Sequence, residues 1–156
     1  MIKSLPVDSP KRRRLPPLLR RAWYALNQAF RRRISSTGLT PDQFTILRWL
    51  SESPMGNPTQ RQLCELMESD PNTIAAVLQR METAGWVERK THERDRRAYR
   101  IQMTAHGKKI YGRTRKMAVR LQTQILEALP KDKQEEFLKQ LEVIANACYL
   151  AAREER

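Results

Sequence analysis

The sequence contains little cysteine and little histidine, with two residues of each among 156. Cys64 and Cys148 lie far apart, each in a helical pattern, so they do not form the framework of a small disulfide-rich protein. We expect a cytoplasmic location and two structural thiols that behave as small buried hydrophobic residues. His92 and His106 are expected at the surface, and no close set of cysteine, histidine and carboxylate side chains indicates a metal site.

Long apolar stretches are also missing. No segment approaches the roughly 20 apolar residues of a membrane span, and charged residues interrupt the N-terminus before it could serve as a signal peptide. The sequence has no nucleophile elbow, no glycine-rich phosphate loop and no cluster of metal ligands. We therefore expect neither an enzyme nor a bound cofactor.

Acidic residues are scarce relative to basic ones: 17 Asp and Glu stand against 30 Lys and Arg, for a net charge of +13. The excess is uneven, because residues 1–37 carry ten basic residues and one acid, and residues 86–116 carry eleven basic residues and three acids. Such clustering indicates a polyanionic partner, with nucleic acid the first expectation and an anionic membrane surface the second.

Three helix starts in the middle of the chain have local capping signals. Thr40 and Thr59 each precede a glutamine by three residues, which is the pattern of a capping box. Asp70, followed by Pro71, predicts a third start, and Gly85 is placed to end that helix. A short helix, a tight turn and an amphipathic helix form the helix-turn-helix arrangement, whose second helix can enter a major groove.

The outer face of that second helix is a candidate DNA-reading surface. Small side chains let a backbone approach the groove, and hydrogen-bonding ones can pair with base edges or phosphates. The alternative is an ordinary solvated helix face. The candidate contacts in the helix-turn-helix are Thr59, Gln60, Asn72, Thr73, Ala76, Gln79 and Arg80.

A two-stranded wing is expected after this helix. Residues 86–91 and 98–103 favour strands, and a charged, arginine-rich tip lies between them. A thin ribbon with cations at its end suits a DNA groove, whereas the alternative is a solvated loop tip. The candidate contacts at the tip are Arg94, Asp95, Arg96 and Arg97.

The helices near both ends are more apolar than a small winged domain could cover. We expect residues 17–37 and 108–153 to form a helical dimerisation layer, with a winged helix-turn-helix domain at 38–107, in a fold that is mainly α with a small β-wing. Residues 1–16 form a basic arm that either contacts DNA or is a tail with incidental charge. The dimerisation candidates are Leu19, Leu26, Phe30, Leu121, Ile125, Leu141 and Cys148.

Roughly residues 17–150 resemble the MarR family of winged helix-turn-helix regulators. The sharpest match is the wing pattern Asp-x-Arg, five residues, Leu-Thr-x-x-Gly, which runs here from Asp95 and Arg97 to Thr104 and Gly107, with Met103 in place of leucine. The segments 39–44 and 81–89 also look like that family's second-helix opening and its link into the wing.

This resemblance implies a homodimer on a pseudo-palindromic operator in double-stranded DNA. Arg97 would enter the minor groove and Asp95 would orient it. It also implies release by a small aromatic ligand or another effector in a crevice between the dimer layer and the winged domain. Four aromatic residues could line such a crevice or equally belong to the core, so no ligand site is assigned: Trp23, Tyr24, Trp49 and Tyr111.

Three features depart from the family pattern. Glu68 occupies a turn position where glycine is common, Ala75 and Ala76 occupy positions where polar or basic residues are common, and the first helix lacks the cysteine of the peroxide-sensing branch. The function expected is that of a sequence-specific dimeric regulator, usually a repressor. The alternatives are an effector-independent architectural nucleic-acid-binding protein and a membrane-surface binder acting through the basic helix at 17–34.

Overall fold

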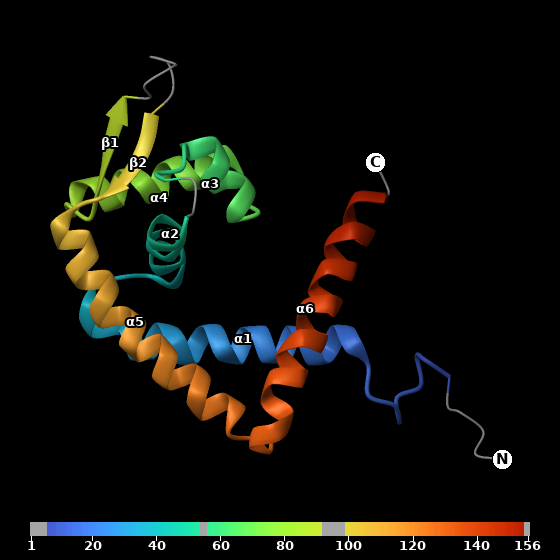
Figure 1. The fold of residues 1–156 in the computed structure, drawn as a ribbon. Coiled ribbons are helices and arrows are strands. Elements are labelled where there is room, and N and C mark those ends of the chain that lie inside the picture. Colours follow the sequence, from blue (N-terminus) through green and yellow to red (C-terminus); the bar gives the residue numbers. More distant parts are fainter. Residues whose placement is uncertain (1–5, 54–55, 92–98, 155–156) are drawn as a thin grey trace. The chain divides into compact units, whose positions relative to one another are not determined.

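The computed structural model describes residues 6–53, 56–91 and 99–154, and it is mainly helical with one small antiparallel sheet (Figure 1), so the expected fold class is confirmed. Its contacts divide the chain into two compact units, Met1–Met117 and Ala118–Arg156. The elements are α1 (Leu15–Ile34), the 3-10 turn η1 (Ser35–Thr37), α2 (Pro41–Glu52), α3 (Gln60–Leu66), α4 (Pro71–Thr83), β1 (Val87–Thr91), β2 (Tyr99–Met103), α5 (Ala105–Leu126) and α6 (Lys131–Glu154).

Helix α1 begins two residues earlier than the sequence predicts. Pro16 and Pro17 both lie inside its first turn. A helix tolerates proline there because the first amides have no partner within the helix. The basic arm is therefore shorter by two residues than the predicted 1–16.

The two capping boxes predicted in the sequence are confirmed. The hydroxyl of Thr40 accepts the backbone N–H of Gln43 at 3.3 Å, and the side-chain oxygen of Gln43 accepts the N–H of Thr40 at 2.9 Å. Thr59 and Gln62 make the same reciprocal pair at 3.3 and 2.8 Å. Each box satisfies two amides that the helix itself leaves unpaired, so the starts of α2 and α3 are fixed by local sequence.

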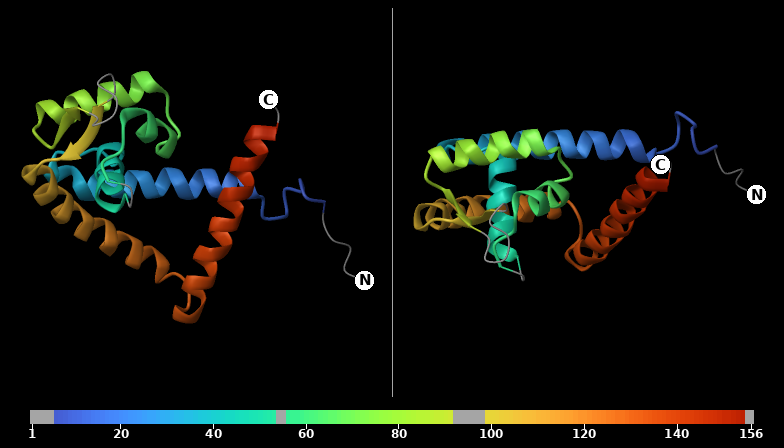
Figure 2. Two further views of the ribbon diagram at one scale, coloured as in Figure 1. Left: turned by 45° about the horizontal axis from the view of Figure 1, so that its top comes forward. Right: turned by 90° about the horizontal axis from the view of Figure 1, so that it is seen from above.

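The core of the first unit lies where α2 packs against α1, α3, α4 and β2 (Figures 1 and 2). Burying one large aliphatic side chain in such a core stabilises the folded state by about 1.5–3 kcal/mol. Phe44 of α2 also contacts two rings, edge-on to Phe30 with centroids 5.1 Å apart and stacked on Tyr111 at 5.6 Å. The side chains with at most 1% exposure are Ile34, Ile46, Leu47, Leu63, Ile74, Leu78, Met81, Ile101 and Thr114.

The wing has the predicted pair of strands. β1 and β2 run antiparallel, with Val87 opposite Met103 and Thr91 opposite Tyr99. A third segment joins them, which the sequence did not predict: the N–H of Ile101 donates to the carbonyl of Pro58 at 2.9 Å, and Thr59 forms an isolated bridge with Arg100. The start of α3 is thus attached to the wing.

The second unit leaves its apolar side chains largely exposed. Helix α6 has no buried residue among those described, and the side chain of Leu141 is 38% exposed. Cys148 is exposed and Cys64 is half-buried, so the expectation of two buried thiols is wrong for Cys148 within a single chain. The reason is that α6 carries a one-sided apolar stripe that nothing in the second unit covers.

Candidate nucleic-acid interface

Helix α4 brings its five predicted contact residues onto one exposed face. Positions i, i+1, i+4, i+7 and i+8 fall on one side of a helix with 3.6 residues per turn. The opposite side is buried through Ile74, Leu78 and Met81, so packing decides which face points outward. The exposed residues of this face are Asn72, Thr73, Ala76, Gln79 and Arg80.

The start of α4 is held by Asp70. Its carboxylate accepts the backbone N–H of Thr73 at 2.9 Å and the Thr73 hydroxyl at 2.5 Å. The hydrogen bond from the Thr73 side chain, followed by the one from its backbone, lowers the pKa of Asp70. This contribution to stability is therefore present above the ordinary pKa of aspartate and is lost as the pH falls through the lower folded value.

The turn between α3 and α4 depends on an unusual backbone conformation at Glu68. Its φ is +48°, in the left-handed region, and it is the one residue other than glycine with positive φ among those described. The N–H of Ser69 reaches the carbonyl of Cys64 at 3.0 Å, and the N–H of Glu68 reaches that of Glu65 at 3.2 Å. These bonds form a Schellman motif, in which glycine is the residue without strain.

The turn after α4 is the same motif with glycine in place. Gly85 has φ of +71°, the N–H of Trp86 donates to the carbonyl of Met81 at 3.0 Å, and the N–H of Gly85 donates to that of Glu82 at 2.9 Å. An ion pair joins α4 to β1 beyond this turn, with the Nε of Arg89 3.0 Å from the carboxylate of Glu82. Helix α4 is therefore preceded and followed by turns of the same geometry.

The segment Thr104–Gly107, called here the corner, connects the wing to α5. The Thr104 hydroxyl donates to the carbonyl of Gly85 at 2.6 Å and accepts the N–H of Gly107 at 2.9 Å. A Cβ placed on Gly107 would lie 2.0 Å from the carbonyl oxygen of Trp86. In the Thr-x-x-Gly pattern, the threonine therefore caps the start of α5, and the glycine allows the close approach to the carbonyl of Trp86.

The tip of the wing carries the predicted contacts Arg94, Asp95, Arg96 and Arg97, which lie outside the described residues. On β2, one residue from the tip end of the strand, Arg100 has a structural role, because its guanidinium donates to the carbonyl of Asn57 at 2.8 Å. No pattern in the sequence signals this role. The two remaining predicted contacts, Thr59 and Gln60, are half-buried at the start of α3.

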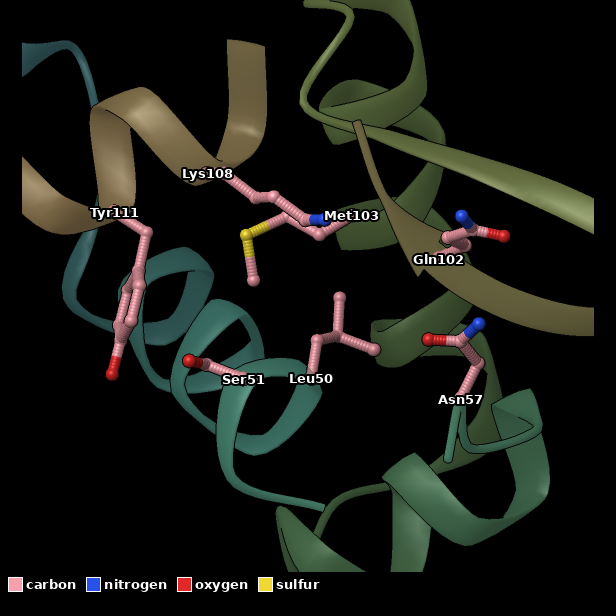
Figure 3. A pocket seen from close by; sticks show the side chains of 7 residues that line it. All are labelled: Leu50, Ser51, Asn57, Gln102, Met103, Lys108 and Tyr111. Atoms are coloured by element: carbon pink, nitrogen blue, oxygen red, sulfur yellow. The ribbon is translucent and has the colours of Figure 1, made fainter. Parts of the chain in front are cut away.

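A cavity of about 540 Å³ lies beside the wing base within the first unit. Figure 3 shows Leu50 and Ser51 from α2, and Lys108 and Tyr111 from α5, around the same space as side chains of β2. Its lining combines apolar side chains, hydroxyls, amides and one cation, and contains no acid. The remaining lining residues are Asn57, Gln102 and Met103.

The predicted dimerisation residues divide into two groups. Leu121 is buried, and Leu19 and Phe30 are half-buried, with Phe30 engaged by Phe44 of its own chain. The others are exposed: Leu26, Ile125, Leu141 and Cys148. Trp23 and Tyr24, on α1, are also exposed.

Two absences apply to the part of the chain that the structure describes. No group of three or more His, Cys, Asp or Glu side chains in that part could hold a metal ion. None of the helices in it is sufficiently long and apolar to span a bilayer.

Comparison with known proteins shows which family the chain resembles. A model of the MarR family matches residues 37–98, which include α2, α3, α4 and β1. The chain is 31% identical over 103 residues to a putative transcriptional regulatory protein for the hcr operon of Thauera aromatica, covering 65% of this chain and 61% of that protein's length. It is 27% identical over 135 residues to the transcriptional regulator HosA of Escherichia coli O111:H-, covering 83% and 98% of the two chains.

The structure of the repressor CouR bound to a 23-mer DNA duplex is also similar, with a TM-score of 0.76, 26% identity and coverage of 84% of this chain and 92% of that one. The chain resembles the MarR family of transcriptional regulators in sequence and in fold. MarR-family regulators are non-enzymatic DNA-binding proteins, so this resemblance supports the expectation of a regulator rather than an enzyme. The family model covers the helix-turn-helix and the first wing strand, and it ends before β2.

For a chain that resembles DNA-binding regulators, the charge of the helix-turn-helix is unexpected. Residues 59–83 carry two arginines, Arg61 and Arg80, and four acids, for a net charge of −2. The helix α5, by contrast, carries six basic residues and no acid. The positive charge therefore lies on α5 and not on the helix-turn-helix.

Proposed function

We propose that this chain is a homodimeric repressor that binds a pseudo-palindromic operator and is released by a small effector. The observation that carries the proposal is the exposed face of α4, where Asn72 and Gln79 offer amides, Arg80 offers a cation, and Ala76 lets the helix backbone approach. CouR, which shares the fold, was solved on a DNA duplex. A repressor of this kind would act in the cytoplasm, where its operator lies.

The exposed apolar side chains support the homodimer. On α1, Trp23 is 68% exposed and Tyr24 66%, and on α6, Val143 is 66% and Leu150 60% exposed. Apolar surface of this extent is rare on a protein that remains monomeric. A second copy of the chain is the partner that the two-fold symmetry of an operator requires.

The cavity beside the wing base supports an effector site. Its volume of about 540 Å³ falls in the range of small-molecule pockets, roughly 300–1,000 Å³. Lys108 would attract a carboxylate, while Tyr111 and Met103 would contact an aromatic ring. The site lies against β2, so occupancy would act on the strand that leads into the wing tip residues Arg94, Asp95, Arg96 and Arg97.

Selection of bound duplexes from a random pool tests the DNA-reading assignment. The wild-type chain should enrich a two-fold symmetric site, because two α4 helices read two half-sites. The variant Gln79→Ala should relax preference at particular base pairs, by about 1–3 kcal/mol for a paired base contact. Gln122→Ala, the same substitution at an exposed position of α5, is the matched control and should leave the site unchanged.

Two outcomes would contradict the proposal. Enrichment of no common sequence would indicate an architectural protein, and equal weakening on every duplex would mean that Gln79 contacts only phosphate. Repeating the selection with aromatic carboxylates tests release, and a site that survives every ligand would count against an effector of that class. Sedimentation equilibrium of the full chain should give twice the monomer mass.

A further inference from the structure

Helix α5 carries an exposed stripe of cations that the proposed contacts of α4 and the wing do not include. Lys109, Arg113, Lys116 and Arg120 follow one another at i, i+4, i+7 and i+11, so they lie along one side of the helix. At 1.5 Å per residue the row is about 16 Å long. We call these four residues the cationic stripe.

The stripe is separate from the faces that pack. Tyr111, Thr114 and Leu121, at 7%, 0% and 5% exposure, lie on another side of the helix. The predicted dimerisation residue Ile125 falls on that same side, four residues after Leu121. Dimerisation through Leu121 and Ile125 would therefore leave the stripe open to solvent.

No acid among the described residues forms an ion pair with the stripe. Helix α5 contains no Asp or Glu, and the ion pairs found among the described residues involve none of the four cations. Six positive charges on one helix repel each other, which costs free energy unless a polyanion binds. The helix-turn-helix, with its net charge of −2, cannot supply this attraction to a phosphate backbone.

We propose that the cationic stripe of α5 is a second, sequence-independent contact surface for the phosphate backbone of duplex DNA. In this proposal the stripe contributes affinity for duplex DNA of any sequence, whereas α4 and the wing select the operator sequence. This inference rests on the proposed DNA-binding function, and it extends that function to residues outside the winged motif.

Duplex DNA suits the stripe better than an anionic membrane. A helix that lies on a membrane presents an apolar face beside its cations and inserts it among the lipids. The apolar face of the first half of α5 is buried through Tyr111 and is not available for insertion. Around the first three cations of the stripe no large apolar side chain of α5 is exposed, although Val119 is exposed near Arg120. A row of flexible cationic side chains of this kind fits a line of phosphates instead.

The test compares two triple variants that remove the same charge. The first is Lys109→Gln, Arg113→Gln and Lys116→Gln on α5. The matched control is Lys131→Gln, Lys133→Gln and Lys139→Gln on α6, where all three lysines are also exposed. Glutamine keeps a helix propensity close to that of lysine and arginine, and circular dichroism melting confirms that each variant is folded.

Binding to a long random-sequence duplex is measured across a range of salt concentrations for both triple variants. Each lost phosphate contact lowers the slope of log K against log salt by about 0.9, so the α5 triple should lower it by about 2–3. The α6 triple should change the slope by less than about 0.9, which is the contribution of one phosphate contact. Equal slopes for the two triples would mean that only net charge matters, and would overturn the proposal.

Two further measurements separate the alternatives. Vesicles that contain phosphatidylglycerol should bind the wild type and the α5 triple alike, and a loss of vesicle binding with an unchanged DNA slope would assign the stripe to membranes. Selection from a random pool with the α5 triple should return the wild-type sequence at lower affinity. Failure of the wild type to select any sequence would contradict the proposed operator reading, while a slope difference between the triples would still support the stripe.

Discussion

In the proposed complex with DNA, the helix-turn-helix contributes a defined shape and helix α5 contributes positive charge. Residues 59–83 have a net charge of −2 and a shape determined by two side-chain caps and a left-handed turn, whereas α5 carries six cations and no acid. A reader of base edges needs a defined shape, because hydrogen-bond readout depends on where each donor lies. Attraction to phosphate requires only charge within reach, so it can be placed on a neighbouring helix.

The corner at Thr104–Gly107 is where the two elements meet. There the start of α5 lies against the carbonyls of Gly85 and Trp86, which end α4 and begin the wing. The charged helix α5 is therefore positioned by the C-terminal turn of α4. A substitution at this contact can change how α5 is held without altering any charge.

The largest effect is expected from Gly107→Ala. Its Cβ would lie 2.0 Å from the carbonyl oxygen of Trp86 and 2.8 Å from the Cγ of Met103, so the backbone must move. We expect a loss of about 1–3 kcal/mol in the free energy of unfolding, the usual cost of overpacking. Denaturant titration followed by circular dichroism measures it.

Gly112→Ala is the matched control on the same helix. Nothing lies within 4 Å of a Cβ at that position, so alanine should raise stability by about 0.5–1 kcal/mol through helix propensity. Equal effects at the two glycines would show that the corner is loose and that α5 is not positioned by the end of α4.

Local patterns in the sequence predicted the parts of the fold that depend on neighbours in the chain. Thr40 and Thr59 form their capping boxes, Asp70 caps α4, and Gly85 ends it, because each interaction spans only three or four residues. The outward face of α4 followed from its apolar periodicity for the same reason. The wing strands formed as alternation predicted.

Long-range contacts were not predictable in this way. The bridge between Thr59 and Arg100 and the bond from Arg100 to Asn57 join segments about 40 residues apart, and no local signal marks them. The exposure of Cys148 depends on what covers α6, which a helical pattern does not specify. Ala76 shows a further limit, because the helix pattern places it on the exposed face without showing which bases it would approach.

Glu68 offers the smallest and most discriminating test. Its left-handed conformation costs a residue with a Cβ roughly 1 kcal/mol, and its charge lies in the turn that leads into α4. Glu68→Gly and Glu68→Asn relieve the strain, since glycine and, to a lesser degree, asparagine accept this conformation. Glu68→Gln removes the charge and keeps the strain.

The three variants separate shape from charge. Thermal unfolding should show a gain of about 0.5–1 kcal/mol for glycine, less for asparagine and little for glutamine, because only the first two relax the backbone. Affinity for random-sequence DNA should rise equally in all three, because each removes one carboxylate near the phosphates. If DNA affinity instead follows stability across the three variants, the turn limits binding through its shape. In that case the net charge of −2 on the helix-turn-helix does not affect its attraction to the phosphate backbone.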